Sequence, residues 1–324
     1  MQTIQVQEPG GPEVLSAVEV EDPRAGRGEV VVDVAASGVN FVDTYERSGL
    51  YPRPTPFVLG VEGAGTVTAV GPGVDDVAVG DRVAWADGRG SYAERVALPA
   101  ARVVPVPDEV DDRTAAAVLL QGLTAHYLVR DTHPLAPGER CLVHAGAGGV
   151  GLLLVQIAKL LGAEVFTTVG SQEKAELVRA AGADHVILYR DEDFGDAVER
   201  VAGRRPLHVV YDGVGRATFA RGLELLRPRG IMVTFGNASG PVDPVSPLAL
   251  MRGGSLYLTR PTLGDHVATT GRLRDRAREL FGWVAAGQVE VRVGVTLPLE
   301  QAAEAHRLLE GRATTGKVLL LPPA

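Results

Sequence analysis

Cysteine is almost absent from this 324-residue chain, and the single Cys141 cannot form an intramolecular disulfide. Such cysteine usage is typical of a reducing compartment. The first five residues lack the basic and then apolar pattern of a signal peptide. The most apolar stretch, residues 150–161, is too short to span a bilayer and contains Gln156 and Lys159. These absences predict a soluble, cytoplasmic protein that does not enter a membrane.

Positive charge is also scarce. Lys and Arg number 32 against 40 Asp and Glu, which gives a formal net charge of -8, and basic runs never exceed two residues. An acidic surface is repelled by nucleic acid unless the fold assembles a local basic patch. The sequence therefore disfavours nucleic acid as a partner.

Residues that bind metals are few and scattered. One cysteine excludes a four-cysteine zinc lobe, and no two histidines have the spacing of a ligand pair. We expect no metal site. The histidines stand at positions 126, 133, 144, 185, 208, 266 and 306.

The first part of the chain, to residue 122, is rich in Val, Gly and Pro. Short alternating runs such as 29–34 and 65–70 are separated by turn signals such as Gly71-Pro72-Gly73. This pattern predicts a mostly β domain.

From residue 123 onward, predicted strands alternate with predicted helices that end at glycine. This alternation predicts a doubly wound parallel sheet of the Rossmann type. The strands are expected at 140–145, 164–169, 185–189, 207–212 and 231–235, and the helices at 150–161 and 173–181.

The last part changes pattern again, with helices expected at 270–287 and 299–311 and a strand at 317–321. We expect this tail to pack on the N-terminal domain. The predicted domains are thus 1–122 with 266–324, and 123–265.

The most informative stretch is a glycine turn. Gly146, Gly148 and Gly151 match G-x-G-x-x-G between a predicted strand and a predicted helix, and Gly149 and Val150 complete the turn. The first glycine permits the tight turn, the second lets the backbone approach a diphosphate, and the third lets helix and strand pack closely. Backbone amides and the helix dipole then favour the diphosphate, so the motif predicts dinucleotide binding.

The end of the next strand predicts which dinucleotide binds. NAD enzymes carry an acidic residue there for the ribose 2′-hydroxyl, but this chain has Gly170, followed by Ser171 and Lys174. Without the carboxylate, and with a lysine close by, a 2′-phosphate is favoured, although Glu173 opposes it. We therefore predict NADPH. The alternative for Lys174 is a solvated residue in the first turn of a helix.

Taken together, these segments resemble the medium-chain dehydrogenase/reductase superfamily, and within it the zinc-free quinone oxidoreductase (zeta-crystallin-like) branch. The resemblance covers nearly the whole chain. It is carried by residues 38–45, 59–65, 79–83, 120–125, 144–151, 210–215, 235–237 and 312–317. It implies a GroES-like catalytic domain beside the Rossmann domain, and a homodimer.

The resemblance also implies which residues bind NADPH. Those expected around the adenosine 2′-phosphate are Gly170, Ser171, Lys174, Tyr189 and Arg312. Those expected at the nicotinamide end are Asn40, Phe41, Val42, Asp43, Phe235 and Asn237, and Thr124 and Gly236 are also expected to bind the cofactor. Tyr189, Arg312 and Asn237 could instead be a strand-end aromatic, a surface charge and a turn residue.

Two positions that hold metal ligands in the zinc-dependent relatives are altered here. Asn40 replaces the first cysteine, and Gly60-Val61-Glu62 replaces Gly-His-Glu. Alcohol oxidation uses zinc to lower the pKa of the hydroxyl, whereas a quinone needs no Lewis acid because its ring gains aromaticity on reduction. Glu62 is then expected to hold local structure.

The candidate catalytic residues are Asn40, Tyr45 and Tyr51, each of which could donate a hydrogen bond to an oxyanion that develops on the acceptor. Each tyrosine could equally be a packed loop residue, and Asn40 could hold cofactor rather than substrate. His144 is expected to be a packed strand residue and Cys141 a core residue.

The predicted activity is NADPH-dependent quinone reduction. Reduction of an enone or enal double bond is the alternative within the same chemistry, and a non-catalytic NADPH-binding protein, crystallin-like or RNA-binding, is the alternative in another class. The residues leave open the physiological acceptor, the choice between one- and two-electron reduction, and the group that protonates the product.

Overall fold

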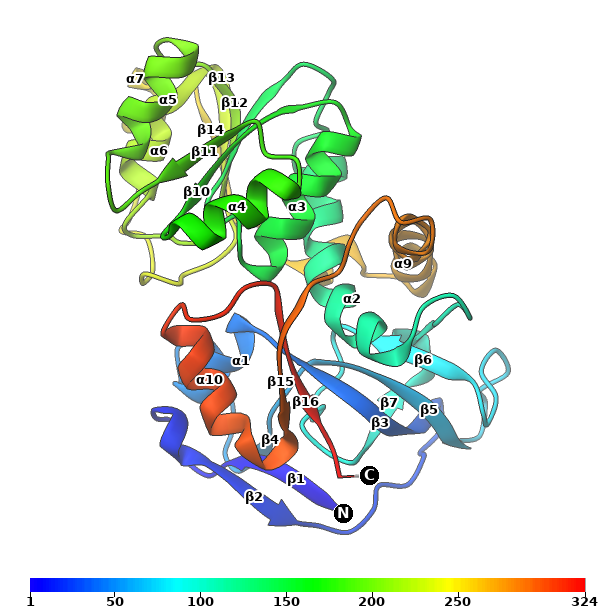
Figure 1. Cartoon of the computed structure of the whole chain (residues 1–324). Coiled ribbons are helices and arrows are strands. Elements are labelled where there is room, and N and C mark those ends of the chain that lie inside the picture. The colour runs from blue at the N-terminus through cyan, green and yellow to red at the C-terminus, as the bar shows by residue number, and fades with distance from the viewer. Residues whose placement is uncertain (324) are drawn as a thin grey trace. The chain divides into compact units, whose positions relative to one another are not determined.

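The computed structural model describes residues 1–323 and divides into two compact units (Figure 1). Unit 1 consists of Met1–Leu123 and Val267–Ala324, and unit 2 consists of Thr124–His266. The chain therefore leaves unit 1 once and returns to it for its C-terminal segment. Within the described residues, no helix is long and apolar enough to span a membrane.

Unit 1 is built on a seven-stranded sheet in the order β15-β16-β3-β5-β6-β8, with β7 also paired to β3. A second, three-stranded sheet has the order β2-β1-β4. The C-terminal strand β16 pairs antiparallel with β3, with Val318 opposite Val39, so the tail forms part of the main sheet. The strands are β1 (Gln2–Val6), β2 (Leu15–Glu19), β3 (Glu29–Val39), β4 (Phe57–Val58), β5 (Glu62–Val70), β6 (Arg82–Trp85), β7 (Arg95–Pro99), β8 (Val104–Pro105), β15 (Val293–Pro298) and β16 (Lys317–Leu321).

Alternation of side chains explains the core of unit 1. Along β3, Val30, Val32 and Val34 pack with Trp85 on one side of the sheet, because successive side chains of a strand point to opposite faces. The helices are α1 (Phe41–Arg47), α2 (Asp112–Tyr127), which continues from unit 1 into unit 2, α9 (Thr270–Ala285) and α10 (Ala302–Glu310).

Unit 2 contains a six-stranded sheet in the order β11-β10-β9-β12-β13-β14, in which each strand pairs parallel with its neighbours. This order reverses between β9 and β12, as in doubly wound Rossmann sheets. The predicted parallel sheet is confirmed. The strands are β9 (Arg140–Val143), β10 (Glu164–Val169), β11 (His185–Leu188), β12 (Leu207–Asp212), β13 (Leu226–Thr234) and β14 (Tyr257–Thr259).

The helices of unit 2 follow the strands in turn. They are α3 (Gly149–Leu160), α4 (Gln172–Ala180), α5 (Phe194–Ala202), α6 (Phe219–Leu225), α7 (Pro247–Arg252) and α8 (Leu263–His266). Several elements differ from the prediction. The helices α5 to α8 and the strand β14 were not predicted, and β13 begins five residues before the predicted start at 231. Pro228 and Gly230 break the apolar pattern at the start of β13, although Leu226 still pairs with Leu207.

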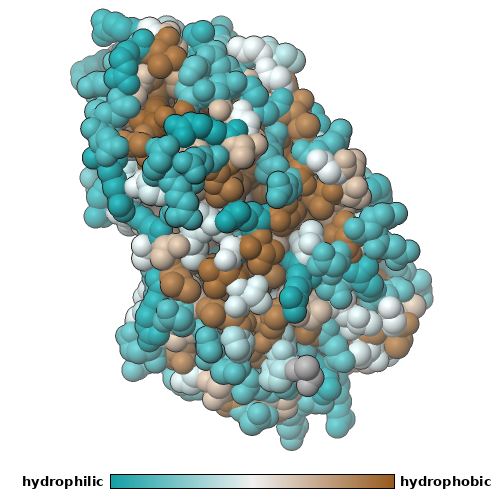
Figure 2. Space-filling view, in the orientation of Figure 1, coloured by the Kyte–Doolittle hydropathy of each residue, from teal (hydrophilic) through white to brown (hydrophobic). Residues whose placement is uncertain are grey.

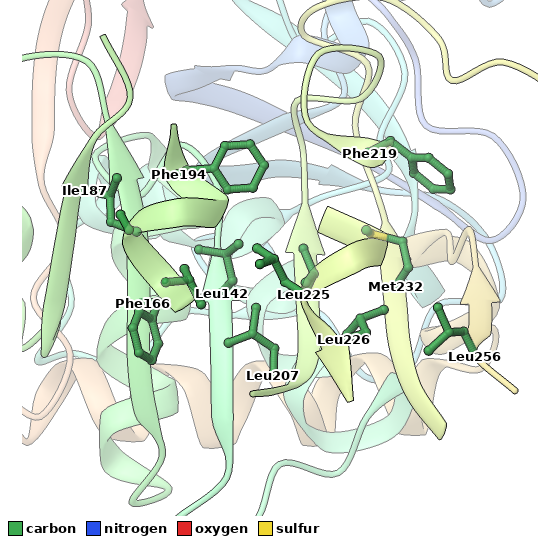
Figure 3. Close-up of a cluster of buried hydrophobic side chains, with 13 residues drawn as sticks. Leu142, Phe166, Ile187, Phe194, Leu207, Phe219, Leu225, Leu226, Met232 and Leu256 are labelled. Carbon is green, nitrogen blue, oxygen red and sulfur yellow. The ribbon is translucent and has the colours of Figure 1, made fainter. Parts of the chain in front are cut away.

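One face of this sheet holds a large apolar cluster (Figure 3). Leu142, Phe166 and Val210 extend from the strands towards Phe194 of α5 and Phe219 of α6. Burial of this many large side chains contributes roughly 1.5–3 kcal/mol for each one, so the sheet is a rigid base for the loops at its edge.

On the face shown in Figure 2, hydrophilic residues predominate and apolar residues gather in several groups among them. Apolar atoms make up much of any folded surface, so the view alone assigns no function to these groups. In unit 2, the exposed large apolar side chains include Leu248, Met251 and Tyr257.

Candidate functional site

The glycine turn lies between β9 and α3, as the motif predicts. A Cβ at Gly146 would collide with Thr167 Oγ1, and a Cβ at Gly151 would collide with Ala145 O. Both positions therefore require glycine for close packing of helix, turn and strand. At Gly148 the nearest atom to an added Cβ is Ala145 O at 3.2 Å, so this side of the turn is more open.

The start of α3 presents backbone amides to that open side. Gly148 is the N-cap residue of α3, and as a glycine it has no side chain that could cap the helix. The first amides of any helix lack an intrahelical acceptor, and the helix dipole adds positive potential. The turn thus fits a phosphate or diphosphate group.

The ends of β10 and β11 form the next part of the site. A Cβ at Gly170 would stand 2.6 Å from Tyr189 Oη, so glycine makes room for the half-exposed tyrosine ring. Ser171 caps α4, and its hydroxyl oxygen accepts the Lys174 amide hydrogen at 3.3 Å. The hydroxyl hydrogen is still available for a ligand oxygen. Gly170, Ser171, Lys174 and Tyr189 therefore gather in one place, as the sequence predicts.

The ends of β12 and β13 are packed against each other. A Cβ at Gly213 would stand 3.1 Å from the Phe235 ring, and one at Gly236 would collide with Gly213 O. Arg260, just beyond β14, donates to Gly236 O at 3.0 Å. With its amide oriented to satisfy both ends, Asn237 accepts from Arg260 at 3.1 Å and donates to Gly236 O.

Asp212 is a structural residue of this edge that sequence reasoning did not single out. Its Oδ1 accepts from the amides of Val214 at 2.7 Å and Gly215 at 3.0 Å, and the carboxylate accepts from the Thr218 hydroxyl at 2.9 Å. The signal was present as an acidic residue at the end of an apolar strand before Gly-Val-Gly. Asp212 fixes the loop against which Phe235 packs.

These loops all follow the carboxyl ends of parallel strands, so they lie along one edge of the sheet in strand order. The order of predicted residues along that edge is Tyr189 after β11, Gly170 to Lys174 after β10, the glycine turn after β9, and Phe235 to Asn237 after β13. A long ligand with a phosphate at one end and a diphosphate in its middle matches this order.

His144 lies between β9 and the glycine turn and is buried. Its Nδ1 is 3.0 Å from Thr168 Oγ1, its ring packs edge-on against Phe194, and Nε2 has no hydrogen-bond partner among the described residues. Burial lowers the pKa of this imidazole. His144 is packed as expected, but β9 ends at Val143, so His144 lies just after the strand and not within it. Cys141 is also buried, which raises the pKa of its thiol to about 12.

Unit 1 contains the second group of candidate residues, and its centre is a buried ion pair. Lys317 Nζ contacts Glu62 Oε2, and both side chains are almost fully inaccessible, at 1% and 0%. Lys317 Nζ also donates to Asn40 Oδ1 at 2.8 Å, and Asn40 Nδ2 donates to Glu62 Oε2 at 2.8 Å. The two altered metal-ligand positions, Asn40 and Glu62, thus surround an ammonium group that sequence reasoning missed.

Asn40 has all its side-chain groups occupied in this arrangement. Its amide hydrogens go to Glu62 and to Gly38 O at 3.2 Å, and its oxygen accepts from Lys317 and from Gln121 at 3.4 Å. The structure therefore offers no spare amide donor for an acceptor oxyanion among the described contacts of Asn40. The predicted oxyanion role is weaker than a role in holding the loop.

Asp43, predicted to lie along the cofactor, has a fully buried carboxylate in α1. Its Oδ2 accepts from the Asn40 backbone amide at 2.8 Å and from Tyr92 Oη at 3.0 Å. Burial raises the pKa of Asp43 to about 7. Tyr92 is in turn 3.2 Å from His306 Nε2, and burial lowers the pKa of His306 to about 3.

The hydrogen bonds in the series from Arg47 through His306 and Tyr92 to Asp43 have a fixed direction. An arginine can only donate, so Arg47, 3.0 Å from His306 Nδ1, makes that nitrogen the acceptor and leaves the hydrogen on Nε2. Arg47 also makes two hydrogen bonds to Glu310, at 2.8 and 3.0 Å. The side chains of Asp43 and Arg47 thereby fasten α1 to the C-terminal helix α10.

The candidate tyrosines lie in α1 and shortly after it. Tyr45 is in α1, and its ring meets the ring of Tyr51 edge-on at a centroid distance of 5.2 Å. Phe41 lies 6.2 Å from Tyr45, and the Tyr51 amide donates to Tyr45 O at 3.0 Å. Tyr51 is 39% exposed. Phe41, Tyr45 and Tyr51 thus form one aromatic group on the segment that starts at Asn40.

Two further predicted residues cannot be joined to these groups. Thr124 is buried within α2, and Arg312 follows α10 with a left-handed backbone φ of 56°. Arg312 belongs to unit 1 and Gly170 to unit 2, so their shared role at a 2′-phosphate stays a prediction. Among residues 1–323, no group of three His, Cys, Asp or Glu side chains is placed to hold a metal ion.

Comparisons with known proteins identify the family of the chain. Residues 26–108 match the family model of the alcohol dehydrogenase GroES-like domain, and residues 149–281 match that of zinc-binding dehydrogenase. A quinone oxidoreductase of Pseudomonas aeruginosa is 47% identical over 97% of each chain, and a 2-haloacrylate reductase of a Burkholderia species is 40% identical over 97% of each.

Among solved structures, the Escherichia coli quinone oxidoreductase complexed with NADPH is 44% identical. It covers 99% of this chain and 100% of its own, with a TM-score of 0.97. The predicted family and the predicted pairing of a Rossmann and a GroES-like domain are confirmed. The chain belongs to the quinone oxidoreductase branch of the medium-chain dehydrogenase/reductase superfamily.

Proposed function

We propose that this protein is an NADPH-dependent reductase of quinones. The observation that carries the proposal is the order of the loops along the sheet edge of unit 2, which matches the parts of NADPH in sequence. The relatives named quinone oxidoreductase, at 45–47% identity over nearly the full length, support the acceptor class.

The residues of unit 2 fit the cofactor. The amides of Gly149, Val150 and Gly151 would bind the diphosphate, since Gly148 adds no side chain in their way. Ser171 and Lys174 would bind the 2′-phosphate beside Tyr189, and a carboxylate at position 170 would repel it. Phe235 and Asn237 would lie near the nicotinamide, which is the end of the cofactor that supplies hydride.

In unit 1, the aromatic group of Phe41, Tyr45 and Tyr51 would receive the acceptor. Flat conjugated rings pack well on aromatic side chains, and a tyrosine hydroxyl can donate to oxygen at the ring edge. The protein must hold the acceptor carbon about 3–3.5 Å from the hydride donor and exclude water. No strong base is required for this chemistry.

Reduction of an activated carbon–carbon double bond is the second candidate. The relative named 2-haloacrylate reductase, at 40% identity over 97% of each chain, favours it. The same site could serve both reactions, because each delivers hydride to a conjugated acceptor.

The experiment is to follow NADPH oxidation at 340 nm with a panel of quinones, enones and 2-haloacrylates. Turnover that is highest with quinones supports the main proposal. Highest turnover with enones or haloacrylates would replace it by the second candidate. Tight NADPH binding without turnover of any acceptor would indicate a non-catalytic protein and contradict both.

Two finer statements complete the proposal. A homodimer is supported by β14, which is an edge strand of the six-stranded sheet and begins with the exposed Tyr257. The preceding helix α7 carries the exposed Leu248 and Met251. A second copy that adds its own β14 around a two-fold axis would cover both edges at once. A cytoplasmic location is supported by the use of a single, buried cysteine.

A further inference from the structure

The buried ammonium of Lys317 is the least expected feature of unit 1. Lys317 is one of only three lysines in the chain, and it opens the apolar strand β16. A buried lysine is costly unless a carboxylate neutralises it and hydrogen bonds satisfy it. Here Glu62 and Asn40 meet both needs.

The sheet register explains why these three side chains meet. Val318 lies opposite Val39, so Lys317 of β16 stands next to Asn40 at the end of β3. Glu62 lies opposite Gly38 on the other neighbour of β3. The ammonium thus links three adjacent strands at the point where β3 leads into α1.

Gly38 provides the space for this group. A Cβ at position 38 would collide with Glu62 Oε2 and would stand 2.7 Å from both Lys317 Cε and Ala116 O. Gly38 therefore lacks a side chain at the position where the ion pair lies between β3 and α2. The ion pair fits in this position only because residue 38 is glycine.

The ion pair also reaches α2. Glu62 Oε1 accepts from the Leu120 amide at 2.6 Å, and Gln121 Nε2 donates to Asn40 Oδ1 at 3.4 Å. One ammonium group thereby holds the start of α1, which carries Tyr45, against α2 and two strands. Without it, Glu62 would be a buried charge with no counter-ion.

We infer that Lys317 is a positioning residue for the reaction, and that its ammonium serves as the fixed internal cation that holds Asn40 and Glu62 and so orients the α1 segment towards the acceptor. This inference rests on the proposed function. Lys317 acts through Asn40 and α1 rather than on the acceptor itself.

The test is chemical rescue of Lys317→Ala, which leaves a cavity beside Glu62. We expect turnover number with the best quinone to fall at least tenfold, while the dissociation constant for NADPH changes less than threefold. Ethylammonium chloride should restore turnover at least fivefold with saturation. Tetramethylammonium has no N–H donor and should not restore turnover. The control variant Lys159→Ala, which removes a surface lysine paired with Asp184, should respond to neither salt.

Wild-type turnover number and Michaelis constant in Lys317→Ala would overturn the inference. The inference would also be overturned if the loss of turnover in Lys317→Ala were explained by a lower unfolding temperature and ethylammonium did not reverse it. If Lys317→Ala does not fold, the neutral pair Lys317→Met with Glu62→Gln takes its place. It should fold with impaired turnover, and wild-type turnover in that variant would overturn the inference.

Failure of the proposed function is a separate result, because it appears as absent quinone turnover in the wild-type protein. In that case the role of the Lys317 ammonium is tested through the unfolding temperature. Ethylammonium should raise the unfolding temperature of Lys317→Ala above its value in tetramethylammonium, and equal temperatures in the two salts would contradict the role of Lys317.

Discussion

At the scale of single residues, glycines in this protein mark where other groups need space. Gly170 makes room for Tyr189, and Gly38 makes room for Lys317 and Glu62. The sequence draws attention to Gly170, because an acidic residue is expected at that position in NAD enzymes. It gives no such signal for Gly38, because Glu62 and Lys317, which fill the space beside it, are 24 and 279 positions away in the chain.

Lys174 determines the choice of cofactor in our proposal. Lys174→Ala should weaken NADPH binding roughly tenfold, about 1.4 kcal/mol, and leave NADH binding nearly unchanged, because only NADPH carries the extra phosphate. The measurement is fluorescence titration with both nucleotides. Arg179→Ala at the exposed far end of α4 is the matched control and should change neither constant. An equal effect of Lys174→Ala on NADPH and NADH would show that Lys174 does not contact the 2′-phosphate.

Tyr51 is the residue on which the acceptor site depends. If its hydroxyl stabilises charge on the acceptor, Tyr51→Phe should lower turnover number by roughly 10–1000-fold, the upper end being typical for loss of one oxyanion donor. NADPH affinity should stay the same. The exposed Tyr257 of β14 offers a control, since Tyr257→Phe also removes one hydroxyl and keeps the ring. Unchanged kinetics in Tyr51→Phe would leave the ring with a packing role only.

At the scale of elements, α1 is short but anchored at both ends. Asp43 in its first turn accepts from the Asn40 amide, and Arg47 in its last turn binds His306 and Glu310 of α10. The resemblance to zinc-dependent relatives singles out the run from Asn40 through Tyr45 to Tyr51, because it replaces their metal-binding loop. It could not show that residues 306 and 310 hold this segment, since neither has a local pattern that sets it apart from an ordinary helix.

The buried carboxyl of Asp43 makes this anchor dependent on pH. Its pKa of about 7 in the folded protein exceeds the usual value near 3.9 in an unfolded chain. Stability from the protonated form is therefore complete below about pH 4 and is lost as pH rises to about 7. Facing groups include Tyr92, Lys317 and Glu46 as well as the Asn40 amide.

Asp43→Asn keeps the size of the side chain and removes this titration. The unfolding free energy of the wild-type protein should therefore decline relative to that of the variant between pH 4 and pH 8, by up to about 4 kcal/mol. Urea denaturation at several pH values measures the difference. The contribution of His306 to the unfolding free energy has the opposite sign in this range, because its imidazole is neutral in the folded protein and gains a proton on unfolding. His306 is present in both proteins, so this contribution cancels to first order in the comparison. A difference that is constant with pH would show that Asp43 is ionised throughout.

The elements that could be predicted share a physical basis. Strands β10 and β12 match their predicted ranges because apolar runs bounded by turns leave no alternative. Strand β14 could not be predicted, since Tyr257 to Thr259 has only three residues and pairs on one side alone. Likewise, the glycine turn that we propose for the diphosphate follows from a local motif, whereas the network around Lys317 depends on register between strands distant in sequence.

At the scale of the whole molecule, the C-terminal tail returns to unit 1, so that unit is complete only when the last strand has been made. Lys317, His306 and Glu310 all come from this tail and all contact the α1 segment or its anchors. The acceptor site that we propose is therefore built from both ends of the chain. The two units each carry one half of the candidate machinery.

The homodimer that we propose depends on the free edge of β14. A strand edge with exposed apolar residues favours association with a second edge, and a two-fold axis makes the surface complementary to itself. The double variant Met251→Glu with Tyr257→Glu places two like charges on each copy, which would face each other across the axis. We expect the wild-type protein to show twice the 34.0 kDa chain mass by light scattering and the variant to show a single chain mass. Val201→Glu on α5 is the control, because it adds a charge at an equally exposed apolar position of the same unit. A variant that keeps the wild-type mass would move the interface away from β14, and a wild-type protein of single chain mass would contradict the dimer itself.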